Sequence, residues 1–95
     1  MTNTKVSILI ANYNGEKFIP DCINSLKEQT YKNIEIIFFD DLSKDDSINE
    51  IKKFKNIKII ENKIKTDIGS FNQMNAYKKG FELSTGEIIL FLDTE

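Results

Sequence analysis

The stretch that most constrains the fold is an apolar run that leads directly into a pair of acids. Residues 36–39 are all apolar, and Asp40 and Asp41 follow without a break. A short apolar run of this kind is typical of a strand that is buried on both faces, as in a parallel sheet. Ligands of open α/β sheets bind beyond the carboxyl ends of the strands, so the aspartates stand where a ligand would bind. The alternative is a purely structural turn, in which Ser43 or Asp45 caps the next helix.

Apolar runs and helical patterns alternate along the whole chain. Besides residues 34–39, runs rich in β-branched residues predict strands at 5–11, 57–60 and 88–92. Apolar residues recur at helical spacing in three intervening segments, which begin near Glu16, Ser43 and Gly69. Pro20 fits only the first turn of the first helix. This alternation predicts a parallel sheet with right-handed crossovers and helices on both faces. We therefore expect one α/β domain over residues 1–95, a Rossmann-like three-layer α/β/α fold with strand order 3-2-1-4.

Composition and charge narrow the classes of function. The chain has 95 residues with 40% hydrophobic and 29% charged content, which is typical of a small globular domain. Its net charge of -2 gives no electrostatic reason to expect nucleic acid as a partner. Cys22 is the only cysteine, so we expect a buried structural thiol rather than a disulfide. The sequence shows neither a signal peptide nor an apolar run as long as a membrane helix, which favours the cytoplasm or the inner face of the cell membrane.

Chemically distinctive side chains stand at three of the predicted strand ends. The first strand leads into Tyr13 between two asparagines, the second into Asp41, and the fourth into Asp93. With the order 3-2-1-4 these three ends would meet in one crevice, at the point where the winding of the sheet reverses. An aromatic ring can stack on a base, and carboxylates can accept from a base N–H or hold a divalent cation that bridges phosphates. This combination suits a nucleoside diphosphate.

Several motifs, in a fixed order, resemble those of a known family. They are the strand and Tyr-Asn turn at 6–14, the helix end at 25–31, the acidic strand end at 35–43, and the segments 84–87 and 91–95. Together they cover nearly the whole chain and resemble the N-terminal, nucleotide-sugar-binding part of a family 2 glycosyltransferase with the GT-A fold. Two positions depart from the family pattern. Ala11 stands where many members have a proline-threonine or similar pair, and Leu42 replaces the usual glycine.

The resemblance implies a role for each matching residue. Tyr13 would stack near the base of a nucleoside-diphosphate sugar, and Ala11 would contribute backbone near the base. Asp41 would accept a hydrogen bond from a base N–H. Asp93 and Glu95 would begin the site for Mn²⁺ or Mg²⁺ and for the ribose. The cation would neutralise the leaving diphosphate.

The same resemblance implies an inverting enzyme of bacterial cell-surface polysaccharide synthesis. It would transfer a sugar from a nucleoside-diphosphate sugar, expected to be a UDP-sugar, to a glycan or lipid-linked acceptor. Residues 1–95 would supply the donor-binding half of a truncated GT-A fold, without the acceptor-binding portion. The family's catalytic base comes from a later segment, so we assign no catalytic residue and expect the 95-residue chain alone to be inactive.

Two other classes of protein are consistent with the same alternation of strands and helices. A receiver-like signalling domain shares the alternation, but its acidic pair follows the first strand, where this chain has an Asn-Tyr-Asn turn at 12–14. A non-catalytic Rossmann-like module is the second alternative, with a homodimer formed through the apolar edge of the fourth strand at 88–92. Among single residues, Tyr13 would then pack on the first helix. Asp40 would bind backbone amides of its turn, and Asp45 and Asp46 would be helix-start acids.

Overall fold

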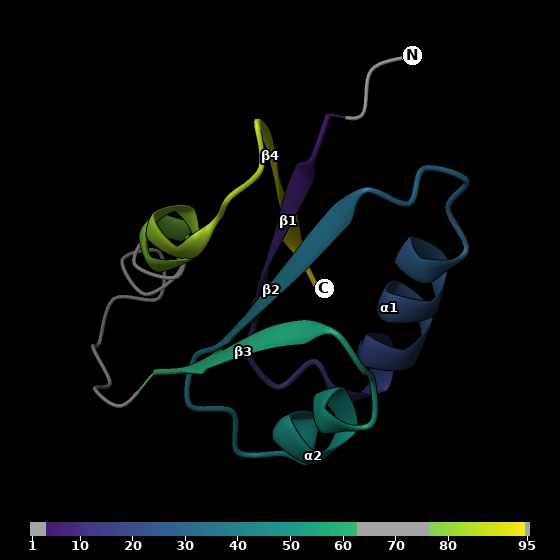
Figure 1. Ribbon diagram of the computed structural model, residues 1–95. Coiled ribbons are helices and arrows are strands. Elements are labelled where there is room, and N and C mark those ends of the chain that lie inside the picture. The colour runs from purple at the N-terminus through teal and green to yellow at the C-terminus, as the bar shows by residue number, and fades with distance from the viewer. Residues whose placement is uncertain (1–3, 63–76, 95) are drawn as a thin grey trace.

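The computed structural model describes residues 4–62 and 77–94, and its elements follow the predicted alternation (Figure 1). They are β1 (Val6–Asn12), the 3₁₀ turn η1 (Glu16–Phe18), α1 (Ile19–Lys27), β2 (Ile34–Asp40), α2 (Ser47–Lys52), β3 (Ile57–Glu61) and β4 (Ile88–Asp93). Residues 77–83 are helical and lead into β4. The third predicted helix begins near Gly69, which lies outside the described residues, so the structure confirms only its last part.

The described strands form one parallel sheet in the order β3-β2-β1-β4, which confirms the predicted order. β1 lies inside the sheet and pairs with β2 on one side and with β4 on the other. At the carboxyl edge, Asn12 is level with Asp40 of β2, and Ala11 is level with Asp93 of β4. The register therefore brings the ends of β1, β2 and β4 to the same edge of the sheet.

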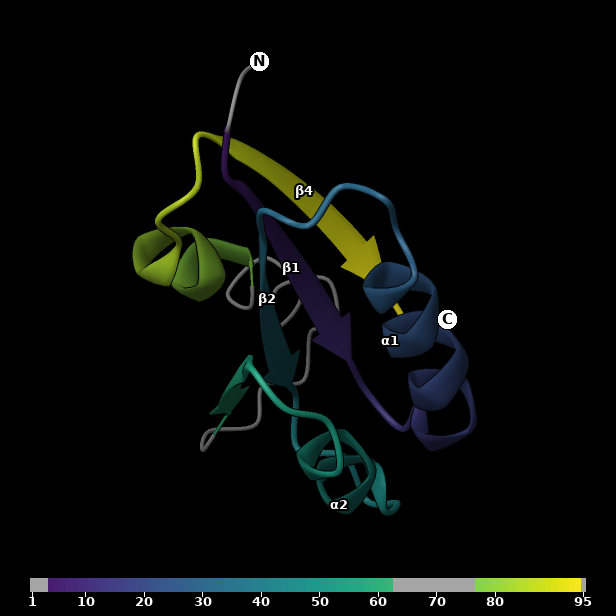
Figure 2. The same ribbon diagram turned by 45° about the vertical axis from the view of Figure 1, so that its right-hand side comes forward.

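Helices lie on both faces of the sheet, with α1 and α2 on one face and the 77–83 helix on the other (Figure 1 and Figure 2). The main core lies between the sheet and the α1–α2 face, and its buried members are Ile8, Ile10, Ile19, Ile23, Ile36, Phe38 and Ile51. Cys22 packs against this core, where burial raises the pKa of its thiol, as expected for a structural cysteine. None of the helices in the described ranges is long and apolar enough to cross a membrane.

The opposite face of the sheet carries the alternate residues of β1 and β2. Ala11 and Phe39 are buried there, and Tyr77 packs against them. A Cβ atom at Gly80 would lie 3.1 Å from the side chain of Leu9, so the glycine lets the helix approach the sheet closely. This close approach accounts for a residue that lowers the helix propensity of its segment.

The start of the second helix differs from the prediction. The sequence predicts a helix beginning within residues 43–46, whereas α2 begins at Ser47. Ser43 is unavailable as a helix start because its backbone N–H and its hydroxyl both donate to the carboxylate of Asp40. Asp45 serves the helix instead, since its Oδ1 accepts from the Ser47 backbone N–H at 3.0 Å. The structural alternative for Asp45, a helix-start acid, is thereby confirmed.

A charge network closes the amino edge of the sheet around Glu35 of β2. The Glu35 side chain is only 7% exposed and accepts from Lys58 Nζ at 2.7 Å, from Ser7 Oγ at 2.5 Å and from the Thr85 backbone N–H at 2.8 Å. Burial raises the pKa of Glu35, but the hydrogen bonds from Lys58, Ser7 and Thr85 outweigh it and hold the pKa at about 2. The network joins β1, β2, β3 and the segment before β4.

Candidate functional site

The carboxyl edge of the sheet holds the side chains that the sequence singles out. Tyr13 follows β1 directly and is 43% exposed, so its ring is accessible at this edge. Asp41 follows β2, and Asp93 is the last residue of β4. The level register of these strands places the three positions at one edge, as the order 3-2-1-4 requires. Glu95, the second predicted cation ligand, lies outside the described residues.

Asp41 is held in place from two directions. Its backbone N–H donates to the carbonyl oxygen of Asn12 at 2.9 Å, which extends the pairing of β1 and β2 by one step. Its Oδ1 accepts from the side-chain amide of Asn62, just after β3, at 2.9 Å. Asp41 is half-buried, so the carboxylate is oriented by the protein while part of it still faces solvent. A fixed, partly exposed carboxylate of this kind can accept a hydrogen bond from a ligand.

Asp40 has a structural role, which confirms that alternative from the sequence. It is 3% exposed, and its carboxylate accepts from the Asn12 amide, the Ser43 hydroxyl and the Ser43 backbone N–H. These contacts close the turn after β2 and leave Asp41 as the member of the pair that faces the edge.

The turn after Asp41 keeps a conformation that usually requires glycine. Leu42 has a φ of 55°, in the left-handed region, which glycine adopts freely and leucine adopts only at a cost in free energy. Neighbouring contacts hold the turn in place. Ser43 Oγ accepts from the Asn14 backbone N–H at 2.9 Å, and Asn14 Oδ1 accepts from the Lys44 backbone N–H at 2.7 Å. The loops after β1 and β2 are thus joined side by side.

Sequence reasoning missed two buried polar residues beneath the edge, Asn12 and Thr94. Asn12 is 2% exposed and Thr94 is 6% exposed. Thr94 Oγ1 donates to Asn12 Oδ1 at 2.8 Å, and the Thr94 backbone N–H donates to the carbonyl oxygen of Ala11 at 3.3 Å. The sequence did contain a signal for Asn12, because the side-chain amide of an asparagine at the end of a buried strand must find hydrogen-bond partners.

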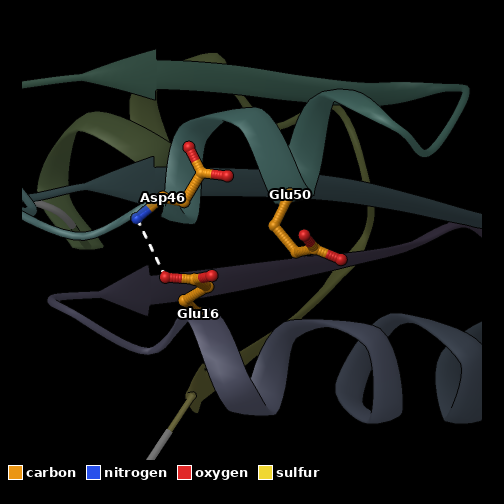
Figure 3. Close-up of side chains that lie close together, drawn as sticks. All are labelled: Glu16, Asp46 and Glu50. Carbon is orange, nitrogen blue, oxygen red and sulfur yellow. Dashed lines mark hydrogen bonds between the residues drawn. The ribbon is translucent and has the colours of Figure 1, made fainter.

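A group of three acids lies near the start of α2, away from the predicted site residues. Carboxylate oxygens of Glu16, Asp46 and Glu50 lie within 4.8 Å of one another (Figure 3). Glu16 Oε1 accepts from the Asp46 backbone N–H at 3.0 Å, and Glu50 pairs with Lys53 at 3.0 Å. Within the described ranges neither Asp41 nor Asp93 takes part in such a group. The contacts of Glu16 and Glu50 explain the cluster as local bonding at the start of a helix.

Known proteins share this fold, and some are similar in sequence over most of the chain. The chain is 41% identical over 90 residues to the UDP-Glc:alpha-D-GlcNAc-diphosphoundecaprenol beta-1,3-glucosyltransferase WfaP of Escherichia coli, covering 95% of this chain and 35% of that enzyme. The structure of residues 1–349 of S. aureus TarS in complex with UDP-GlcNAc superposes with a TM-score of 0.76 at 28% identity, over 95% of this chain and 26% of that 1–349 chain. The mannosyltransferase PcManGT from Pyrobaculum calidifontis, solved with GDP-Man and Mn²⁺, has the same fold, with a TM-score of 0.84 at 18% identity over 99% of this chain and 28% of that chain.

The chain matches only part of the length of its relatives, whereas the family model matches nearly the whole chain. The chain spans 28%, 27% and 35% of the lengths of three curated relatives, from Nostoc, Bacillus subtilis and Escherichia coli. On this chain, by contrast, the matching region of the family model runs over residues 7–94 and so includes nearly all of every strand of the sheet. From this match, the chain belongs to glycosyl transferase family 2.

Proposed function

We propose that this chain binds the donor in a reaction that transfers a sugar from a UDP-sugar to a glycan or lipid-linked acceptor of cell-surface polysaccharide. The observation that carries the proposal is the convergence of Tyr13, Asp41 and Asp93 at the carboxyl edge of the sheet. S. aureus TarS, solved with UDP-GlcNAc, and the UDP-Glc-dependent relative WfaP support a uridine donor. The diphosphoundecaprenol in the name of WfaP supports a lipid-linked acceptor.

The base of the donor would bind between the ends of β1 and β2. Tyr13 offers an exposed ring on which a base can stack. Asp41, held by Asn62 and by the backbone of Asn12, would accept the N3–H of uracil. Ala11 is 8% exposed, so its contribution would come from the backbone at the end of β1.

The diphosphate would bind near the end of β4 together with Mn²⁺ or Mg²⁺. Asp93 fits such a cation, because hard divalent ions take oxygen ligands and Mg²⁺ is often held by one or two carboxylates plus substrate phosphates. Asp93 lies exposed at the strand end, on the same edge as Asp41. In this assignment Asp93 and Glu95 would hold the ion. When bound, the ion supplies Lewis-acid neutralisation of the leaving diphosphate.

The chain's own residues supply binding and orientation, and we assign no catalytic base to them. In this proposal the acceptor and the base that deprotonates it belong to a part of the protein beyond residues 1–95. Since the chain spans about a third or less of its curated relatives, we expect it to bind the donor without turnover by itself.

Calorimetry with a matched pair of nucleotides tests the base assignment. UDP carries an N3–H that a carboxylate can accept, whereas the corresponding nitrogen of CDP carries no hydrogen. We expect wild-type chain to bind UDP more tightly than CDP in the presence of Mn²⁺. Asp41→Asn should weaken UDP binding by about 1–3 kcal/mol, in the range for a hydrogen bond to a charged group, and should remove the preference over CDP.

Asp21→Asn is the control, because it makes the same chemical change, aspartate to asparagine, at an exposed position of α1. We expect its UDP affinity to equal that of wild type. No binding of UDP at millimolar concentration, with or without Mn²⁺, would exclude the donor-binding role. An unchanged preference for UDP in Asp41→Asn would remove Asp41 from the base site.

A further inference from the structure

One buried side chain joins the two halves of the proposed site. Asn12, at the end of β1, uses both ends of its amide. Its Nδ2 donates to Asp40 Oδ1 at 2.9 Å and to Ser43 Oγ at 3.2 Å, on the β2 side. Its Oδ1 accepts from Thr94 Oγ1 at 2.8 Å, on the β4 side. The amide therefore links the turn that carries Asp41 to the segment that carries Asp93.

Thr94 is fixed to β1 by its backbone as well as by its side chain. Its backbone N–H donates to the carbonyl oxygen of Ala11, and its hydroxyl donates to Asn12. Thr94 directly follows Asp93 in the chain, so these contacts fix the backbone position from which the Asp93 side chain projects. Without them β4 would end at Asp93 with no further anchor to β1 in the described segment.

The backbone of Gly15 packs closely against this link. A Cβ atom at Gly15 would lie 2.3 Å from Asn12 Oδ1 and 2.5 Å from Thr94 Oγ1. The loop after β1 thus closes directly over the hydrogen bond and shields it from solvent. A buried hydrogen bond with both partners satisfied favours one geometry, because any displacement leaves a polar atom unpaired.

We propose that Asn12 and Thr94 are positioning residues that set Asp93 at a fixed place relative to Asp41. This inference rests on the proposed function, in which Asp41 binds the base and Asp93 the cation. The nucleotide limits the distance between base and diphosphate to a narrow range, so both groups can be bound together only if the two strand ends keep a matching separation. Loss of the link should then weaken the contribution of the cation to UDP binding while leaving the contacts to the base intact.

Thr94→Val tests this directly, because it removes the hydroxyl and keeps the shape of the side chain. The measured quantity is the metal enhancement, defined as the ratio of UDP affinity in Mn²⁺ to UDP affinity in EDTA. We expect Thr94→Val to lower this ratio by about tenfold, as is typical when a residue that supports a metal ligand is removed. Uridine, which lacks phosphates, should bind Thr94→Val as it binds wild type. Thr94→Ser, which restores the hydroxyl, should restore the metal enhancement.

Thr85→Val is the matched control. It removes the same hydroxyl from a threonine that bonds to Glu35 at the opposite edge of the sheet, so its metal enhancement should equal that of wild type. Circular dichroism first verifies that each variant is folded. If Thr94→Val is unfolded, Thr94→Cys replaces it, since a thiol is a weak donor of similar size, and a reduced ratio is again expected.

The possible outcomes separate the inference from the proposed function. Wild-type chain that binds no UDP overturns both. Wild-type chain with a clear metal enhancement that Thr94→Val retains overturns the positioning role alone. An equal loss of uridine and UDP affinity in Thr94→Val would also overturn it, because a general loss of structure would then explain the effect.

Discussion

Replacing Glu35 with glutamine removes one negative charge from the amino edge of the sheet and keeps the shape of the side chain. The pKa of Glu35 is about 2 in the folded chain, against an ordinary value of 4.5. A difference of this size corresponds to about 3 kcal/mol of folding free energy at neutral pH. Lys58, the charged partner, is 54% exposed, and solvent screening reduces the value. We expect Glu35→Gln to lower the free energy of unfolding by about 2 kcal/mol at pH 7.

The dependence of this loss on pH follows from the direction of the pKa change. Because the folded pKa lies below the unfolded one, the unfolded chain takes up the proton first as the pH falls. The contribution of Glu35 is therefore complete above the unfolded pKa of 4.5 and is lost as the pH falls through about 2. The difference between wild type and Glu35→Gln should be constant from about pH 6 to 8 and more than half lost at about pH 3.

Urea unfolding followed by circular dichroism at pH 7 and at about pH 3 measures both quantities. Glu82→Gln is the matched control, because Glu82 is exposed on the 77–83 helix and its replacement should change the free energy of unfolding by less than about 0.5 kcal/mol. Equal free energies of unfolding for wild type and Glu35→Gln at pH 7 would refute the argument. So would a difference that persists unchanged to about pH 3.

Two further predictions concern the turn after β2 and the edge of β4. A glycine variant is usually less stable than the alanine variant at the same position, but the left-handed φ at position 42 should reverse this order. Leu42→Gly should be more stable than Leu42→Ala by about 1 kcal/mol in urea unfolding. Greater stability of the alanine variant would contradict the presence of backbone strain at Leu42. Ile88, Leu90 and Phe91 are 50%, 48% and 50% exposed on β4, so we expect a homodimer through this edge in sedimentation at about 100 μM and a monomer for Leu90→Lys. Wild-type chain that sediments as a monomer would count against the dimer.

The sheet could be predicted from the sequence because its signal is local and repeated. Each buried strand is a run of apolar residues, and the alternation with helical segments leaves few right-handed arrangements. The start of α2 could not be predicted this way. Serine is a common residue at the N-cap of a helix, but the hydroxyl and backbone N–H of Ser43 are already hydrogen-bonded to Asp40. Thr94 and Asn12 are separated by 82 positions in the chain, so their hydrogen bond becomes visible only once β1 and β4 are known to be neighbours.

The two polar residues at the ends of β1 explain how the strand ends come to lie level. Ser7 donates to Glu35 of β2 and accepts from the backbone N–H of Gly86, just before β4. Asn12 repeats the pattern at the other end, with Asp40 on the β2 side and Thr94 on the β4 side. Ser7 and Glu35 are register partners, as are Asn12 and Asp40, and the residues of β1 between them are apolar.

A slip of one residue in either pairing would break the polar contacts at both ends of β1 and turn polar side chains toward the apolar core. The register of β1 is thus specified at both edges of the sheet, each time by a hydrogen bond to a carboxylate on the β2 side and by a neutral hydrogen bond on the β4 side. Apolar runs alone would tolerate such a slip better, because the residues of β1 between Ser7 and Asn12 are all apolar and buried, so a shifted strand would still place apolar side chains on both faces. The polar ends of β1 therefore determine whether Asp41 and Asp93 arrive at the same level, which is the condition for one nucleotide to contact both.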